Sequence, residues 1–208
     1  MAIVFLLSGC ASVPPRAPEP IPEALAQLWQ RHSQNVQMQT DWTLGARVVA
    51  HTEDDSWNGK LSWHQAGERY QLHFDAPFGQ GAMQLNGGPF QVEMRTSDGQ
   101  VLVAADAETL LYQQLGWQLP LHSLRYWVRG VPEPEHSLNS DRETDAPLLA
   151  FDELGRLSRL NQAQWQIEYP AYRQVNGVML PKKVFLENAE LSVRLVIDQW
   201  GLGDPGTR

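Results

Sequence analysis

Side chains that could perform acid–base, nucleophilic or metal chemistry are scattered along this 208-residue chain. Its six histidines form no His-x-x-x-His pair and no cluster with cysteine, so no metal-binding motif can be recognised. Signatures of serine nucleophiles and phosphate-binding loops are missing, and Gly79-x-Gly81 stops short of a dinucleotide fingerprint. The acids Asp54-Asp55, Glu133 and Glu135 fall in predicted turns, where we expect a solvated surface. Enzyme activity is therefore disfavoured, and no metal or dissociable cofactor is expected.

The single thiol of the chain has a more specific setting. Leu7-Ser8-Gly9-Cys10 resembles a bacterial lipobox, in which small residues let the signal peptidase approach and the thiol takes up diacylglycerol. The apolar run before it is too short to span a bilayer and lacks a basic start, so we interpret residues 1–9 as a truncated signal peptide. We expect Cys10 to carry diacylglycerol and an N-acyl chain as its covalent lipid. The alternative is a buried N-terminal strand with a chance Ser-Gly-Cys.

Residues 10–22 are interpreted as a lipidated tether, because five prolines between Ala11 and Ala24 favour extended polyproline II. The domain is expected over 23–200, followed by a C-terminal tail at 201–208. A formal net charge of −8 makes nucleic acid a poor partner and predicts repulsion from anionic lipid headgroups. Membrane contact must then come from the lipid anchor or from an apolar feature.

The elements that would position other functional residues can be predicted from hydrophobic periodicity. Helical spacing predicts a helix over about 23–35, and from Trp42 onward the period changes to two, which is typical of half-buried strands. Asn86-Gly87 and Asp98-Gly99 are expected to form tight hairpin turns between strands. The strands are predicted around 42–48, 61–63, 70–74, 83–85, 90–94, 101–103, 148–151, 157–160, 165–169, 184–186 and 191–200.

Two helices interrupt this pattern, one from Asp106 to Gly116 and one from Pro120 to Gly130. The fold class is therefore mainly β (α+β): an antiparallel meander of about eleven strands with an N-terminal helix and helices in the middle. Such a sheet can curl into a half-closed barrel. Its large aromatics either form a solid core, which the pattern alone favours, or line an apolar pocket under a helical lid at 106–129. The residues that decide this are Trp63, Phe74, Trp127 and Trp165.

The loop that contains Pro77, Phe78 and Gly79 is the second feature of interest. Proline cannot donate to a strand ladder, and the two glycines after Phe78 loosen the backbone, so this segment is predicted to connect two strands. Phe78 is then a large apolar side chain at a loop tip. It either protrudes or folds back to cap the end of the barrel.

An ordered set of motifs resembles the LolB family of outer-membrane lipoproteins. The match runs from about Trp42 to Trp200 and accompanies the lipobox. Each element alone is weak, but the ordered set is fairly specific. Its elements are Trp42-x-Leu-Gly-x-Arg47, Leu61-x-Trp63, Tyr70-x-Leu72, Ala76-Pro-Phe-Gly79, Asp106-Ala-Glu108, Leu115-Gly-Trp117-x-Leu-Pro120, Leu124-Arg-Tyr-Trp127-x-x-Gly130-x-Pro132, Trp165, Tyr169, Leu180-Pro181 and Trp200.

The resemblance implies an unclosed barrel with a helical lid and an apolar cavity for acyl chains. It implies receipt of lipoproteins from the periplasmic carrier LolA and their insertion into the inner leaflet of the outer membrane by the Pro77-Phe78-Gly79 loop. Phe78 matches a position that is typically leucine in the family, and Ala11 in place of aspartate is similar to an outer-membrane sorting signal. We expect a monomer, anchored on the periplasmic side. The residues expected to line the cavity are Trp42, Trp63, Leu72, Phe74, Leu111, Leu115, Trp127, Trp165 and Ile167.

Two other classes of function stay open from the residues alone. One is a lipoprotein scaffold whose curved sheet binds a protein or peptidoglycan and whose core is solid, and the other is an enzyme acting on an envelope lipid. An apolar pocket of several hundred Å³ would favour the carrier, and a packed interior would favour the scaffold.

Overall fold

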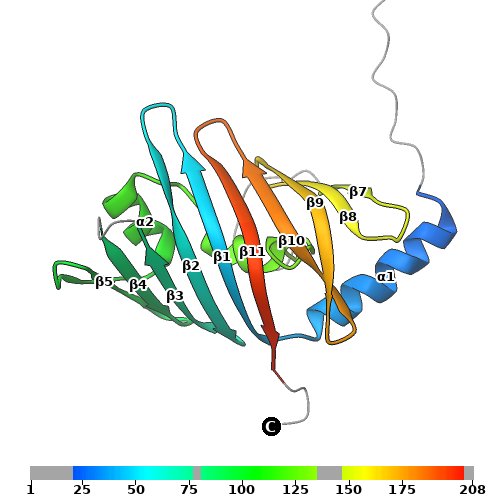
Figure 1. Ribbon diagram of the computed structural model, residues 1–208, viewed down its shortest axis with the longest axis horizontal. Coiled ribbons are helices and arrows are strands. Elements are labelled where there is room, and N and C mark those ends of the chain that lie inside the picture. Colours follow the sequence, from blue (N-terminus) through cyan, green and yellow to red (C-terminus); the bar gives the residue numbers. More distant parts are fainter. Residues whose placement is uncertain (1–20, 77–80, 135–146, 204–208) are drawn as a thin grey trace, which may run out of the picture.

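A single antiparallel sheet of eleven strands dominates the computed structural model, which describes residues 21–76, 81–134 and 147–203 (Figure 1). The strand order is β6-β5-β4-β3-β2-β1-β11-β10-β9-β8-β7, so β6 and β7 form the two edges and the barrel is unclosed. The predicted fold class is confirmed. The strands are β1 (Asp41–His51), β2 (Ser56–Ala66), β3 (Arg69–Asp75), β4 (Ala82–Gly87), β5 (Val92–Thr96), β6 (Val101–Ala104), β7 (Leu148–Phe151), β8 (Leu157–Gln162), β9 (Trp165–Val175), β10 (Val178–Glu187) and β11 (Ser192–Leu202).

The sheet consists of two meanders that are joined where the first strand meets the last. β1 pairs with β11 along its length, from Trp42 opposite Leu202 to His51 opposite Ser192. β11 therefore extends two residues beyond the predicted end of the domain at residue 200. Because β1 and β11 lie at the centre of the sheet, the two ends of the folded domain stabilise each other.

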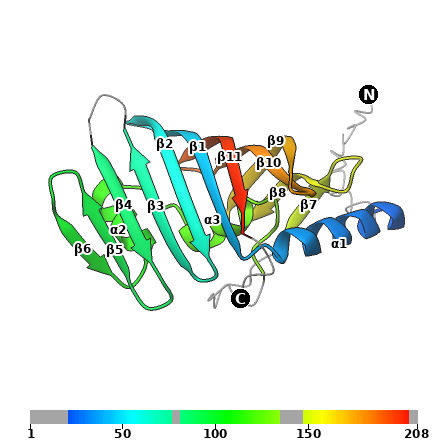
Figure 2. The ribbon, with the colours of Figure 1, turned by 60° about the horizontal axis from the view of Figure 1, so that its bottom comes forward.

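Three helices accompany the sheet: α1 (Glu23–Gln37), α2 (Ala107–Leu115) and α3 (Leu121–Trp127). Asp106 caps α2 by accepting a hydrogen bond of 2.7 Å from the Thr109 amide, and Gly116 ends it with a φ of 70°. Figures 1 and 2 show the sheet curving around α2 and α3, whereas α1 lies outside along the β7–β10 end. The predicted helices are confirmed, and α2 and α3 fill the inner side of the half-barrel.

The core lies between the inner face of the sheet and these two helices. Alternate residues of β1 and β11 are buried, as expected for strands with one covered face. Side chains from both meanders, α2 and α3 form one hydrophobic cluster. In the described part of the chain, no helix is both long enough and apolar enough to cross a membrane.

Two local predictions were wrong. Asn86 and Gly87 belong to β4, paired with Glu93 and Val92, and the chain turns after them. A glycine is needed at position 87 for packing and not for a turn, because a Cβ atom there would overlap the ring of Tyr70. Asp98-Gly99 does turn between β5 and β6, with Gly99 at a φ of 87°.

Phe90 also departs from the prediction. It lies before β5 and is 90% exposed, although the period-two pattern had placed it on a strand. The predicted strand therefore began two residues too early, because position 90 belongs to the connection between β4 and β5.

Candidate functional site

The residues expected to line an acyl-chain cavity all lie in, or pack against, one hydrophobic cluster inside the half-barrel. Eight of the nine are buried, and Phe74, the most exposed of the eight, is 8% exposed. Leu115 is half-buried near the end of α2. The residues are Trp42, Trp63, Leu72, Phe74, Leu111, Leu115, Trp127, Trp165 and Ile167. The structure thus brings together residues from both meanders and both inner helices.

The aromatic residues among these nine fall into three groups of ring contacts. The Trp42 ring lies 5.1 Å from that of Trp63 and 5.7 Å from that of Trp200, at the β1–β11 junction. At the end of α3, Trp127 contacts Trp165 of β9 with ring centroids 6.1 Å apart. Both groups bury large apolar surfaces.

The third aromatic group contains two tryptophans that were not among the residues predicted to line the cavity. Trp57 lies 6.1 Å from Phe74 and 5.7 Å from Trp117, which follows α2. Trp57 has the same strand parity as Leu61 and Trp63 on β2, so the period-two pattern could have found it. Trp117 lies between two helices, where no periodicity marks it.

A depression of about 480 Å³ lies on the outer face of the sheet, across β1–β4 and β11. Small residues, including Gly45 and Ser62, form part of its lining, with Gln71, Gln84 and Gln199 around them. Of the nine predicted cavity residues, Trp63 and Leu72 border it. Its lining mixes polar side chains with parts of Trp63, Leu72 and Trp200, so it is not the apolar pocket that a carrier would need. The interior aromatics contact one another within the hydrophobic cluster.

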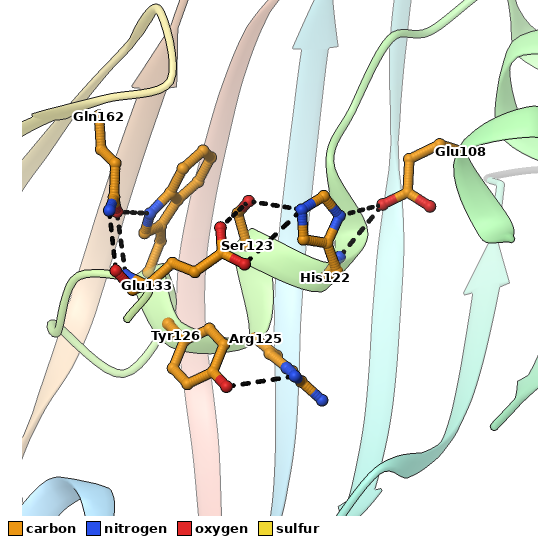
Figure 3. Close-up of polar contacts among 8 residues, drawn as sticks. Glu108, His122, Ser123, Arg125, Tyr126, Glu133 and Gln162 are labelled. Atoms are coloured by element: carbon orange, nitrogen blue, oxygen red, sulfur yellow. Dashed lines mark hydrogen bonds and ion pairs between the residues drawn. The ribbon is translucent and has the colours of Figure 1, made fainter. Parts of the chain in front are cut away.

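A chain of polar contacts, which runs from the half-exposed Glu108–His122 pair to the buried Glu133, ties α2, α3 and β8 together (Figure 3). Glu108 accepts hydrogen bonds from the His122 amide at 3.2 Å and from its ring Nδ1 at 2.8 Å. Next along the chain, Ser123 donates to Glu133 Oε2 at 2.6 Å. Glu133 is 2% exposed, so the prediction that it lies on a solvated surface was wrong. The segment folds inward after α3, which residue type and a turn-like sequence do not reveal.

Gln162 on β8 completes this network. Its Oε1 accepts from Trp127 Nε1 and from the Glu133 amide, each at 2.9 Å, and its Nε2 donates to the Glu133 carbonyl at 2.9 Å. The buried Gln162 side chain therefore provides hydrogen-bond partners for three polar groups of the helical segment. Such partners are needed because these groups are removed from water. This arrangement joins the lid to the second meander.

The electrostatics of the network centre on a histidine. The hydrogen bond with Glu108, followed by the charges of Glu133 and Glu108, raises the pKa of His122 above its ordinary value of 6.5, against the effect of burial. Burial opposes ionisation of Glu108, yet its bonds from His122 hold its pKa below the ordinary value of 4.5. Glu108 and His122 therefore favour the carboxylate and imidazolium forms. The carboxylates of both Glu108 and Glu133 lie close to the His122 ring.

A buried arginine attaches the end of the lid to α1. Arg129 is 6% exposed and donates to the carbonyls of Arg125 at 2.9 Å, Gln39 at 2.8 Å and Val36 at 3.3 Å. Its guanidinium also lies 5.8 Å from the Trp42 ring centroid. Burial lowers the pKa of Arg129 to about 10, so it remains a cation at neutral pH. The C-terminal end of the helical segment is thus held by polar contacts to the α1 region and to β8.

Several predicted functional residues lie outside the described residues: Cys10, Pro77, Phe78, Gly79 and the acid Glu135. The structure describes only the positions on either side of the loop. Ala76 donates its amide to the Gly81 carbonyl at 3.0 Å, and Asp75 pairs with Ala82. The strand directions place this hairpin at the same end of the sheet as the β1–β2 and β10–β11 connections.

Comparisons with known proteins agree with this architecture. A LolA superfamily protein from Nitrosomonas europaea superposes with a TM-score of 0.54 at 10% identity, covering 86% of this chain and 94% of that protein. A DUF1329 family protein from Desulfovibrio piger also gives 0.54 at 10% identity, over 89% of this chain and 94% of that one. At such identities these likenesses establish the fold alone.

Sequence similarity is much closer to one family. An outer-membrane lipoprotein LolB of Nitrosococcus oceani is 38% identical over 96% of this chain and 94% of its own length. That of Alkalilimnicola ehrlichii is 38% identical over 95% and 92%, and that of Stutzerimonas stutzeri 33% over 95% and 91%. The family described as outer membrane lipoprotein LolB matches residues 40–200, and the chain belongs to this LolB family.

Proposed function

We propose that this protein is anchored to the periplasmic side of the outer membrane by lipid on Cys10, receives lipoproteins from a LolA carrier and inserts them into that membrane. The observation that carries the proposal is the cluster of large apolar side chains on the inner face of the half-barrel, in a chain that belongs to the LolB family. Both meanders direct aromatic residues toward α2 and α3, among them Trp63 and Trp165. No bond needs to be made or broken in this function.

The energetics of lipid transfer explain why an apolar interior is needed. Burial of acyl chains is worth about 0.8 kcal/mol per CH₂, so a lipoprotein does not leave its carrier for water spontaneously. A protein interior that accepts the chains keeps them dry between carrier and membrane. Direction then comes from rising affinity, from LolA to this protein and on to the bilayer, without nucleotide hydrolysis.

Access to the interior would come from displacement of the lid. α2 has nine residues and α3 has seven, lengths at which a helix depends on tertiary packing for its stability. We propose that acyl chains replace the contacts that Leu111, Leu115 and Trp127 make with the sheet. The contacts between the lid and the sheet then belong to the ligand-free arrangement, and they are exchanged for contacts with lipid.

A matched pair of variants on α2 tests the acceptance step. Leu111 is 1% exposed and Tyr112 is 58% exposed, so an aspartate at position 111 faces the interior and one at 112 faces solvent. Leu111→Asp should reduce lipoprotein uptake from LolA strongly, and Tyr112→Asp should leave it close to wild type. The measurement is transfer from a LolA–lipoprotein complex, with melting temperatures for both variants.

Photo-crosslinking of the wild-type protein, with a diazirine on the lipoprotein acyl chain, tests the same acceptance step without relying on the stability of a variant. Crosslinks should map to interior residues such as Trp127 and Trp165. Labelling confined to the outer face, around Gln71 and Gln84, would contradict the carrier function.

For delivery, we propose that Phe78 enters the membrane. Burial of one large apolar side chain is worth about 1.5–3 kcal/mol, and a glutamate would reverse that preference. Phe78→Glu should preserve receipt from LolA and reduce transfer to liposomes, while Phe78→Leu should be close to neutral. Equal loss of both steps with a lowered melting temperature would indicate that Phe78 caps the barrel instead.

The outer depression, which carries Gln71, Gln84 and Gln199, favours a second candidate, a lipoprotein scaffold that binds a protein or peptidoglycan partner on its sheet. The crosslinking experiment separates the two functions, because a scaffold would not bring acyl chains into contact with Trp127 or Trp165.

A further inference from the structure

His122 lies between two carboxylates that belong to different parts of the fold. Its Nδ1 is 2.8 Å from Glu108 Oε1, on α2, and its Nε2 is 3.7 Å from Glu133 Oε1, in the segment after α3. Ser123 Oγ is 3.3 Å from the same Nε2 and 2.6 Å from Glu133 Oε2. Figure 3 shows these groups in one line from Glu108 to Glu133.

A count of donors and acceptors shows that this network lacks one proton when His122 is neutral. With its ring proton on Nδ1, which faces Glu108, His122 leaves Nε2 as an acceptor. Nε2 and both oxygens of Glu133 then face one donor, the Ser123 hydroxyl. Glu133 Oε1 has a surface below 1 Å² and no hydrogen-bond partner among the described residues. A buried acceptor without a donor is costly.

A second proton on the imidazole resolves this deficit. Nε2–H would then point to Ser123 Oγ and Glu133 Oε1, and the Ser123 hydroxyl would remain free to donate to Glu133 Oε2. The imidazolium would lie between two carboxylates, with its Nε2 3.3 Å from Ser123 Oγ and 3.7 Å from Glu133 Oε1. No other position of the ring proton satisfies both ends of the histidine.

We propose that His122 carries this second proton in the closed protein, and that the proton latches α2, α3 and the segment to Glu133 onto β8, so that opening of the interior is linked to pH. The latch reaches β8 because the Glu133 amide donates to the Gln162 side chain and the Glu133 carbonyl accepts from it, at 2.9 Å each. Loss of the proton weakens the contacts on both sides of His122 at once.

The groups that face His122 set the direction of this linkage. Glu108 and Glu133 favour the imidazolium, while Arg125 on α3 opposes it. Because the pKa of His122 in the folded protein is raised, its stabilising effect is fully present below pH 6.5 and is lost as pH rises through the folded value. The lid should therefore be held more firmly at mildly acidic pH and open more readily at alkaline pH.

The decisive measurement is made on the full lipidated protein in detergent micelles, without any lipoprotein. Nitrogen-15 NMR of the His122 ring should show both nitrogens protonated at about pH 6. Amide hydrogen exchange of 121–127, corrected for intrinsic rates, should be at least about threefold slower at pH 6 than at pH 8. An Nε2 that stays unprotonated down to pH 5, or pH-independent corrected exchange, would overturn the latch.

Two variants and a matched control sharpen the result. Glu133→Gln supplies a permanent amide donor, so it should fold and remove most of the pH dependence of exchange. His122→Asn retains a donor for Glu108 without the second proton and should also be pH-independent. His64→Asn, on the outer face of β2, should behave as wild type. If His64→Asn removes the pH dependence and His122→Asn does not, the assignment to His122 is wrong.

The consequence for transport rests on the proposed function and is measured separately. Uptake from LolA should be faster at pH 8 than at pH 6 in wild type and should lose this difference in Glu133→Gln. Absent uptake at every pH, with the NMR and exchange results intact, would reject the transport function and leave the latch. Uptake with neither NMR nor exchange signature would reject the latch and leave the transport function.

Discussion

Replacement of Gln162 by leucine is the most direct test of how the lid is attached to the sheet. Gln162 is 5% exposed and makes three hydrogen bonds of 2.9 Å, to Trp127 Nε1 and to the amide and carbonyl of Glu133. Leucine has a similar volume but offers neither donor nor acceptor. Gln162→Leu therefore leaves three groups of the helical segment without partners in a site closed to water.

The expected loss can be worked out from these contacts. An unsatisfied buried polar group costs about 1–3 kcal/mol, so three such groups should lower the free energy of unfolding by at least about 3 kcal/mol. At about 2–4 °C per kcal/mol for a chain of this size, the melting temperature should fall by about 6 °C or more. Apolar packing of leucine recovers too little of this loss to cancel it.

The assay is equilibrium unfolding in urea, followed by tryptophan fluorescence, with thermal melting as a second measurement. Gln166→Leu on β9 is the matched control, because Gln166 is exposed and its side chain makes one hydrogen bond, of 3.5 Å, to Glu168. The control should change the free energy of unfolding by less than about 0.5 kcal/mol. Equal stability of the two variants would refute the assignment of the lid attachment to Gln162.

Two further substitutions test local features. Asp106→Ala removes the 2.7 Å bond that caps α2 at the Thr109 amide and should cost about 1 kcal/mol in thermal unfolding, while Asp106→Asn should retain most of it. Gly87→Ala places a methyl group against the Tyr70 ring and should cost about 1–3 kcal/mol in urea unfolding, whereas Gly88→Ala, whose new Cβ would meet its nearest atom at 3.8 Å, should be close to neutral. A Gly88 variant as damaging as that of Gly87 would contradict the packing explanation.

The elements of this protein could be predicted well because their signals are local. Alternation along β11 and the capping aspartate before α2 each depend on a few neighbouring residues, and both elements appear where they were expected. The same local reasoning was wrong at Asn86-Gly87, where a favourable turn sequence lies in a strand. There the ring of Tyr70 on β3 occupies the space above the glycine, and residues distant along the chain decided the outcome.

The candidate site was only partly predictable, for a related reason. Buried aromatics such as Trp63 and Trp127 could be chosen from residue type and strand parity, because large apolar side chains seek the interior wherever the chain goes. Glu133 could not be chosen, since an acid in a turn-like segment is normally solvated. Its burial became possible only where Ser123 and Gln162 supplied hydrogen bonds from two other elements.

The sequence by itself determined the number of strands, the places of the three helices and a resemblance to the LolB family, because backbone periodicity and capping act over short distances. Only the tertiary structure decided that β1 pairs with β11, which brings Arg47 to Asp198, 151 positions away, and Trp42 to Trp200. Such pairing depends on which surfaces are covered when the whole chain folds. The same holds for the closed lid, in which His122 meets two carboxylates that no spacing along the chain relates.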